Sequence, residues 1–273
     1  MASSDGFAQG NGYTNSIGME FIRIQPGSMT VGKFDPPYLK PSDTVTSNKN
    51  EKSLVMWMPE GQRSYSSAEF KLVEELAKHD AGSGFQVNLT KPFYIGKFEV
   101  TQAQWKKVMG SNPSVFQEVK VPDADSHPVE NVTWKDVQKF IDRLNKLEKG
   151  KKYRLPTEFE WEYAARAGAT SDIAWSEINQ TAQLGTNTTQ PVGQKKPNAW
   201  GLYDMLGNVW EWVSDYYNEK IFADPVPAGR GRQHVLKGAS FVGDVKNATY
   251  FTHAGGPGNN WDVGFRLVME INN

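Results

Sequence analysis

The chain has 273 residues, a formal net charge of −1 and no cysteine. This length is enough for one large hydrophobic core or two small ones. The missing cysteines exclude disulfides, thiolate metal sites and cysteine nucleophiles. The near-neutral charge, without a basic block, argues against a nucleic-acid partner. No run of about 18 apolar residues occurs, so the sequence predicts no membrane span.

The N-terminal third predicts few regular elements. Residues 1–16 are rich in Gly, Asn and Ser and are expected to form an arm. Partial alternation predicts strands at residues 19–24 and 29–31. Residues 35–65 carry many Pro, Ser and Asn, which is typical of a long irregular stretch. Apolar residues at helical spacing predict a short helix over residues 66–78.

The middle of the chain carries the clearest helix signals. Two strands are expected first, at residues 87–89 and 93–98. Three helices follow, each opened by a threonine that is suited to cap its N-terminus. These threonines are Thr101, Thr133 and Thr157, and the helices are expected to end near Gly110, Gly150 and Gly168.

After Gly168 the helical periodicity stops, and the remaining residues are rich in Gly, Asn, Pro and Trp. Short strands are expected at residues 209–213, 234–237 and 264–268. No internal repeat, low-complexity linker or domain boundary is visible. The sequence therefore predicts a single domain over residues 17–273.

Five motifs occur in a fixed order and carry a family resemblance. They are residues 93–101, 127–134, 153–166, 198–212 and 264–267. The chain resembles the sulfatase-modifying-factor, or formylglycine-generating-enzyme, family over almost its whole length. The resemblance implies an α+β fold of the modified C-type-lectin kind. Such a fold is loop-rich, with short twisted antiparallel strands and a few helices. Residues about 35–84 match no family motif and are expected to form an insertion.

Most of the motif residues are expected to be structural. We expect Arg154 to form a buried ion pair that orients the helix after it. The candidate partners are Glu158, Glu160 and Glu162. Four tryptophans are expected to lie in the core. They are Trp161, Trp200, Trp210 and Trp212.

The resemblance also implies a structural calcium ion. Asp204, Gly207, Val209 and Glu211 match the positions that hold calcium in family members. The two carboxylates and two backbone carbonyls would supply the oxygen ligands that calcium prefers. The alternative is that Asp204 and Glu211 only hydrogen-bond the turn. A second family site would need ligands in residues 171–189, where none aligns clearly.

The catalytic pattern of the family is broken. Copper-dependent formylglycine generators carry two cysteines shortly after a segment that corresponds here to residues 237–241. Cu(I) is held by such thiolates. The two positions fall near Gly243 and Ala248. Formylglycine generation by the copper route is therefore rejected.

The C-terminal stretch lines the substrate groove in the family. Here it offers aromatic and amide groups suited to a polar ligand. The ligand-binding residues expected are Phe241, Asp244, Tyr250, His253, Asn259, Asn260 and Trp261. His253 is also a candidate proton-transfer residue, with Asp244 as a second catalytic candidate. The alternative for His253 is a structural role.

Two functions remain open, so the sequence leaves undecided whether the protein is an enzyme. The first is oxidation of a peptide-type or peptide-derived ligand, as in cysteine-free pyoverdine-maturation relatives. The second is binding of a ligand or a protein without catalysis, as in the variable proteins of diversity-generating retroelements. The resemblance to the periplasmic pyoverdine-maturation protein implies a periplasmic or extracellular location.

Overall fold

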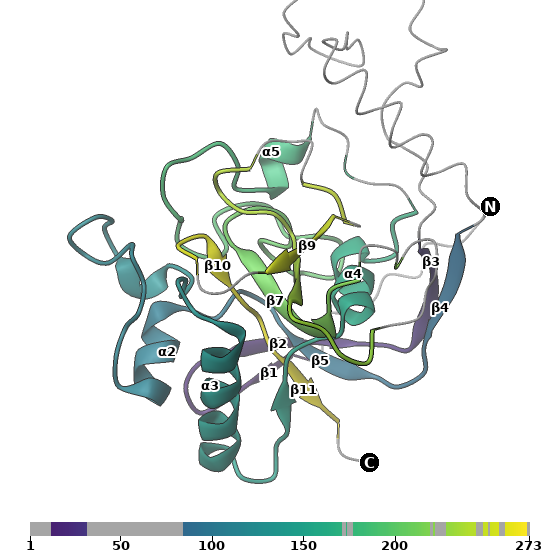
Figure 1. Ribbon diagram of the computed structural model, residues 1–273, viewed down its shortest axis with the longest axis horizontal. Coiled ribbons are helices and arrows are strands. Elements are labelled where there is room, and N and C mark those ends of the chain that lie inside the picture. The colour runs from purple at the N-terminus through teal and green to yellow at the C-terminus, as the bar shows by residue number, and fades with distance from the viewer. Residues whose placement is uncertain are drawn as a thin grey trace, which may run out of the picture.

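The computed structural model describes residues 12–31, 84–170, 173, 177–218, 221, 228–243, 248–250, 252–256 and 260–271. The helix predicted over residues 66–78 lies outside these residues, as does the predicted insertion apart from Gly84. The part of the chain that is described forms a mixed α+β fold with two main sheets, a two-stranded antiparallel sheet and a few helices (Figure 1).

The first sheet brings the two ends of the described chain together. Its strand order is β1-β2-β5-β11-β6, and every neighbouring pair is antiparallel. The strands are β1 (Gly12–Thr14), β2 (Glu20–Ile24), β5 (Phe93–Gly96), β11 (Val268–Glu270) and β6 (Tyr153–Arg154). Part of the predicted N-terminal arm is thus a paired edge strand, because β1 lies within residues 1–16.

The second sheet has the order β10-β7-β8-β9. Its strands are β10 (Val263–Gly264), β7 (Trp210–Tyr216), β8 (His234–Lys237) and β9 (His253–Gly256). β10 runs parallel to β7, and the other pairs are antiparallel. The single strand predicted over residues 264–268 is wrong in its extent. It is divided between β10 and β11, which belong to different sheets.

The third sheet is a two-stranded antiparallel pair of β3 (Gly27–Val31) and β4 (Phe85–Leu89). These strands flank residues 32–84 in the sequence. The pair confirms the two short strands predicted on either side of the irregular stretch.

The three predicted helices begin directly after their predicted capping threonines. Thr101, Thr133 and Thr157 each form a complete capping box at the start of a helix. These helices are α2 (Gln102–Met109), α3 (Trp134–Leu147) and α4 (Glu158–Arg166), and two short ones are η2 (Ala124–Ser126) and α5 (Ile178–Thr181). None of the helices in the described ranges has both the length and the apolar character needed to cross a bilayer.

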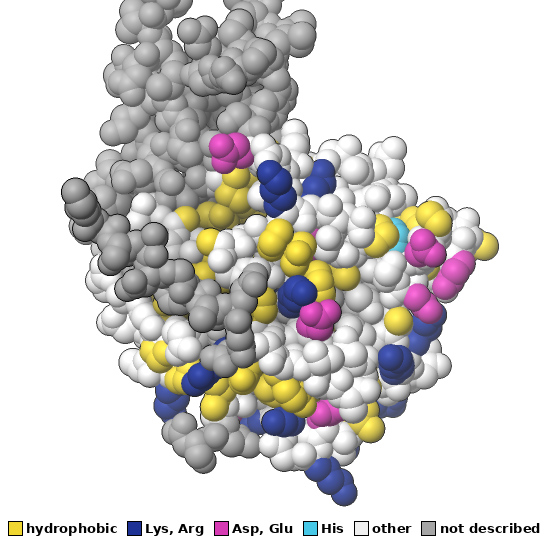
Figure 2. All heavy atoms as spheres, turned by 180° about the vertical axis from the view of Figure 1, so that it is seen from behind, with side chains coloured by type: hydrophobic (Ala, Val, Ile, Leu, Met, Phe, Trp, Pro, Cys, Tyr) yellow, Lys and Arg dark blue, Asp and Glu magenta, His cyan; other side chains and the backbone are white. Residues whose placement is uncertain are grey.

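Aromatic side chains fill much of the interior. Trp161 and Trp212 are fully buried, as predicted, whereas Trp200 and Trp210 are partly buried at the edges of the two main apolar clusters. The Trp105 ring stacks on Phe140 at a centroid distance of 5.1 Å and joins α2 to α3. On the visible part of the opposite face, hydrophobic side chains lie in separate groups among charged and polar ones (Figure 2).

Candidate functional site

A fully buried ion pair lies at the centre of the fold. Arg266 donates from Nε and Nη2 to the Glu211 carboxylate at 2.6–2.8 Å. The same carboxylate accepts a hydrogen bond from Trp161 Nε1 at 2.7 Å. Arg266 also donates to the main-chain oxygens of Gly96, Tyr203 and Asp204. The guanidinium therefore ties β5, β7 and the 203–204 turn together.

Two further carboxyl groups surround this pair. Glu99 is buried and accepts hydrogen bonds from Asn208 Nδ2 and Val209 N at 2.7 and 3.1 Å. Burial raises the pKa of Glu99 well above its ordinary value, and the nearby charges of Asp204 and Glu211 raise it further. Burial also raises the pKa of Asp204 to about 6. Three buried carboxyl groups thus surround one guanidinium, and the raised pKa values favour the protonated forms of Glu99 and Asp204.

Asp204 and Gly207, two of the predicted calcium ligands, lie in the tight turn that the sequence anticipated, whereas Glu211 lies on β7. Asp204, Gly207 and Asn208 have φ angles of 52°, 84° and 59°. Gly207 is required because a Cβ there would lie 2.3 Å from the Gln183 carbonyl oxygen. The Asp204 Oδ1 atom is buried and has no hydrogen-bond partner among the described residues, which fits a cation ligand. The Glu211 oxygens instead already accept from Arg266 and Trp161.

No group of three or more His, Asp or Glu side chains in the described ranges is arranged to hold a metal ion. A calcium ion at this turn would therefore depend on Asp204, on main-chain carbonyls and on water. Calcium binding stays a prediction.

A second ion network lies between α4 and the second sheet. Glu158 and Glu162 are one helical turn apart on α4 and are both buried. The Lys237 Nζ atom, also fully buried, lies 3.3 Å from Glu162 and 3.9 Å from Glu158. Arg166 donates from Nε to Glu162 at 3.0 Å. The expected partner of Arg154 proves to be Glu160, which it contacts at 2.6 and 2.7 Å, in a pair that is partly exposed.

His253 extends this network. Its Nδ1 atom lies 3.0 Å from Glu158 Oε1, although the two groups are not well aligned for a hydrogen bond. The Tyr217 ring covers the imidazole at a centroid distance of 5.1 Å. The His253 side chain is 10% exposed, so part of the ring reaches the surface. The candidate proton-transfer residue thus has a carboxylate beside it.

Phe241 and Trp261, both predicted to bind the ligand, have their rings 5.3 Å apart. Phe116, from a loop that the prediction did not include, contacts Phe241 at 5.4 Å and Trp261 at 6.2 Å. Phe116 and Phe241 are buried, whereas Trp261 is 41% exposed and Val242 is 48% exposed. We call Phe116, Phe241, Val242, Asn260 and Trp261 the Trp261 surface.

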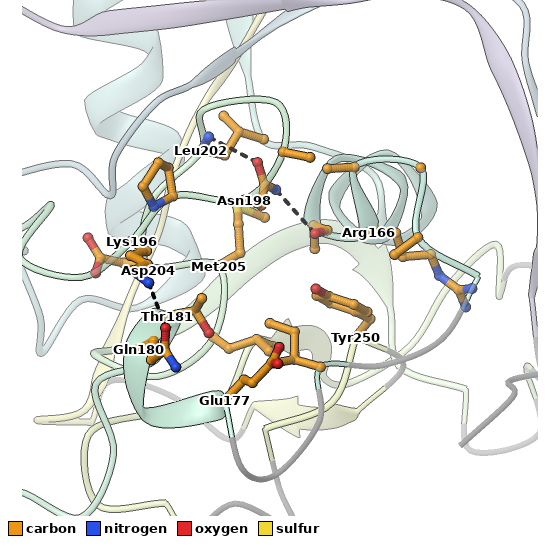
Figure 3. A pocket seen from close by; sticks show the side chains of 18 residues that line it. Arg166, Glu177, Gln180, Thr181, Lys196, Asn198, Leu202, Asp204, Met205 and Tyr250 are labelled. Carbon is orange, nitrogen blue, oxygen red and sulfur yellow. Dashed lines mark hydrogen bonds between the residues drawn. The ribbon is translucent and has the colours of Figure 1, made fainter. Parts of the chain in front are cut away.

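Tyr250 lies elsewhere, in the wall of a cavity of about 610 Å³. The C-terminal end of α4, α5 and residues 196–206 form the rest of the wall. Figure 3 shows the side chains of Tyr250 and Glu177 pointing into this space. At its edge, Lys196 Nζ donates a hydrogen bond to Gln180 Oε1. Leu202 and Met205 contribute apolar side chains to the wall.

The predicted groove residues therefore divide among three surroundings. Phe241, Asn260 and Trp261 share the Trp261 surface, His253 contacts Glu158, and Tyr250 lines the cavity. The two other predicted groove residues, Asp244 and Asn259, lie outside the described residues.

Sequence reasoning gave no role to Glu99 or Phe116, and no role at this site to Glu158. Nothing in the sequence near these residues indicates their partners, which are distant along the chain.

Comparison with known proteins places the chain among relatives of the same fold. The relatives include the Formylglycine-generating enzyme of Streptomyces coelicolor, 29% identical over 88% of this chain and 76% of the relative. The Chaperone protein LppX of Paenibacillus barcinonensis is 32% identical over 65% of this chain and 80% of the relative.

Among solved structures, PvdO from Pseudomonas aeruginosa aligns over 99% of this chain and 100% of its own, with a TM-score of 0.68 and 22% identity. Treponema denticola variable protein 1 aligns over 94% and 98%, with a TM-score of 0.67 and 22% identity. At this level of identity these likenesses show the fold, which is of the formylglycine-generating-enzyme and C-type-lectin kind. The family described as the sulfatase-modifying factor enzyme 1-like domain matches residues 18–271, and the chain therefore belongs to this family.

Proposed function

We propose that this protein binds a polar, peptide-type ligand at the Trp261 surface. The observation that carries the proposal is the position of Trp261, which is 41% exposed while its ring rests on Phe241 and Phe116. A large aromatic side chain fixed by buried neighbours loses little conformational entropy when it binds. Such residues supply much of the binding energy at protein and peptide interfaces.

The polar part of the ligand would be met by groups beside the tryptophan. Asn260 is exposed and can both donate and accept hydrogen bonds. Val242, which follows Phe241, adds exposed apolar area. Because the chain has no cysteine, it cannot supply the two thiolates of copper-dependent formylglycine generation. Binding thus stands as the first function of this site.

The test uses protein labelled with 5-fluorotryptophan. The chain has nine tryptophans, and a Trp261→Phe variant identifies the Trp261 ¹⁹F signal. Tripeptides of the type Ala-X-Ala, with X varied among acidic, basic, amide and aromatic residues, are titrated to about 10 mM, a range that detects weak binding. We expect at least one peptide to shift the Trp261 signal saturably while the Trp212 signal, from a buried ring, stays in place. If no peptide moves it, the proposal is wrong.

A second candidate function is oxidation of a ligand at His253, a residue outside the Trp261 surface. It is favoured by the 3.0 Å approach of His253 Nδ1 to Glu158, since a histidine with a carboxylate beside it is suited to proton transfer. Molecular oxygen would take two electrons and two protons from a catechol-like ring of the substrate, giving the quinone and hydrogen peroxide, and His253 would move the protons. Substrate-dependent oxygen uptake that is reduced in a His253→Ala variant supports this function. Uptake that is absent, or unchanged in the variant, rejects it.

A structural calcium ion belongs to the same proposal. Asp204 would supply the carboxylate ligand, because its buried Oδ1 atom has no partner among the described residues. The carbonyls of Gly207 and Val209 would complete the protein ligands. The ion would stabilise the turn, and its positive charge would favour the ionised form of Asp204, whose pKa burial raises. We also propose a periplasmic or extracellular location, which fractionation of the native cells would test.

A further inference from the structure

Glu130 is a fully buried carboxyl group at the base of the Trp261 surface. Its Oε1 atom accepts a hydrogen bond from the main-chain N–H of Phe116 at 2.9 Å, whereas the buried Oε2 atom has no partner among the described residues. The main-chain N–H of Glu130 donates to the Ser114 hydroxyl at 3.3 Å. Glu130 therefore holds the segment that carries Phe116 through both its main chain and its side chain.

The next residue, Asn131, connects this segment to the other part of the surface. Its Nδ2 atom donates to the Pro113 carbonyl at 2.9 Å, and its main-chain N–H donates to the Asn260 carbonyl at 3.0 Å. Residues 130–131 thus link the two segments whose aromatic rings, Phe116 and Trp261, contact each other. We expect a displacement at Glu130 to reach Trp261 through these few bonds.

Two opposing effects act on the Glu130 carboxyl group. Burial raises its pKa from 4.5 to about 7, because the charged form loses its contact with water. The main-chain N–H groups of Phe116 and Val115 oppose this rise, since they favour the charged form. The effect of burial is the larger one. The ordered structure therefore favours the neutral acid.

An ionised Glu130 would be stabilised by water or by a cation. The cation nearest in effect is Lys120, whose charge acts on this carboxyl group and whose Nζ atom lies 5.9 Å from the centroid of the Phe116 ring. Movement of Lys120 toward the carboxylate, or entry of water, would displace the Phe116 segment. The other ionisable groups on the neighbouring segments have different partners: Glu118 and Asp125 face Lys106, His127 faces Thr189, Asp262 faces Ser240 and Glu99 faces Asn208.

We propose that Glu130 is the positioning residue of the Trp261 surface, holding Phe116 beneath Trp261 as a neutral acid and releasing it on ionisation. The ordered surface binds the proton more tightly than a loosened surface that admits water, so a rise in pH favours the loosened form. Glu130 does not touch the ligand itself. For its functional meaning this inference rests on the proposed ligand site, whose affinity would fall as the pH rises.

The first test needs no ligand. The ¹⁹F signal of Trp261, assigned as above, is followed from pH 5 to pH 9. We expect the wild-type signal to change with a midpoint at or above about 7. Glutamine has the shape of the neutral acid and cannot ionise, so the signal of Glu130→Gln should stay at the wild-type low-pH position. Glu118→Gln, at an exposed side chain of the same loop, is the control and should follow the wild-type profile.

The pH profile separates a positioning role from a purely structural one. A wild-type signal that does not change, or a Glu130→Gln signal that titrates like the wild type, overturns the proposal. If Glu130→Gln does not fold, the wild-type amide signal of Phe116 decides the question, because this N–H donates to the titrating carboxyl group. Its ¹H–¹⁵N shift should change with the same midpoint as the Trp261 signal, and different midpoints reject the proposal.

The second test applies to a peptide that binds the Trp261 surface. Its affinity for the wild-type protein should fall by at most about tenfold per pH unit above pH 7, the limit for release of one proton. The same peptide should show no such fall with Glu130→Gln, which also corrects for titration of the peptide. Equal falls in both proteins reject the regulation. If no peptide binds, the proposed function is wrong, whereas the ligand-free titration still tests Glu130.

Discussion

Arg266 and Glu211 form a buried ion pair in which both carboxylate oxygens accept from the guanidinium, although the residues are 55 positions apart in the sequence. Arg266 belongs to the Gly-Phe-Arg motif near the C-terminus, and Glu211 lies on β7. The pair therefore connects the segment before β11 to β7 of the second sheet.

Replacing Arg266 by Met should destabilise the protein strongly. The change leaves Glu211 buried without its counter-charge and close to Glu99 and Asp204. Breaking a buried pair in this way costs about 3–5 kcal/mol. Urea unfolding measures the loss. The control is Lys139→Met, which removes an exposed pair with Asp136 and should cost less than about 1 kcal/mol. Equal losses in both variants would contradict the structure.

Gly256 should not tolerate even one added methyl group. A Cβ at this position would lie 2.1 Å from Trp212 Cη2, and Trp212 is fully buried and cannot move freely. We expect Gly256→Ala to cost about 1–3 kcal/mol through overpacking. Gly229→Ala is the matched control, because a Cβ there meets no atom within 4 Å. Thermal unfolding compares the two, and a neutral Gly256→Ala would show that this part of β9 packs differently.

Glu130 should make the protein less stable as the pH rises. Its side chain is fully buried, and burial raises its pKa from 4.5 to about 7. The folded state therefore binds this proton more tightly than the unfolded state does. The contribution of protonated Glu130 to the stability of the folded state is complete below about pH 4.5 and is lost as the pH rises through about 7. Ionising a buried Glu130 disfavours the fold by up to about 3 kcal/mol, at 1.36 kcal/mol per pKa unit.

A Glu130→Gln variant isolates this effect, since other groups also titrate in this range. Between pH 5 and pH 8, the unfolding free energy of the wild type should decrease relative to that of the variant, because only the wild type ionises a buried Glu130. Glu118→Gln, at a 64% exposed side chain, is the control and should follow the wild-type profile. A difference that is constant with pH would show that Glu130 does not titrate with folding.

Calcium should raise the melting temperature if Asp204 supplies a ligand. A ligand that binds only the folded state stabilises it by about 2.7 kcal/mol at a hundred times its dissociation constant. We expect the melting temperature to increase with calcium, to fall on chelation, and to lose this response in Asp204→Asn. Asp142→Asn, at an exposed position on α3, should keep the response. If calcium does not change the melting temperature of the wild-type protein, the calcium proposal is wrong.

The elements that could be predicted are those set by neighbours in the sequence. The capping boxes at Thr101, Thr133 and Thr157 join residues only three positions apart, so the pattern alone located each helix start. The strand at residues 234–237 was also predicted, whereas the segment at 264–268 was not divided correctly. The segment is divided because its first residue pairs in the second sheet and its last residue pairs in the first sheet. This pairing depends on the tertiary structure.

The candidate site shows the same limit. The sequence proposed His253 and Trp261 as neighbours in one groove, because both lie in the C-terminal stretch. The structure gives them different partners, Glu158 for His253 and Phe116 for Trp261. Neither partner has a local signal, since each contact spans about a hundred residues or more of chain.

The sequence by itself determined the family, the helix starts and the absence of thiolate chemistry, because these depend on residue identity and on short-range hydrogen bonds. Only the tertiary structure decided which charges meet in the interior. The register of β8 with β9 places Lys237 opposite His253, and the packing of α4 on that sheet brings Glu158 to both. Burial makes the loss of any of these pairings costly in stability, because a charge removed from water needs a partner within the fold.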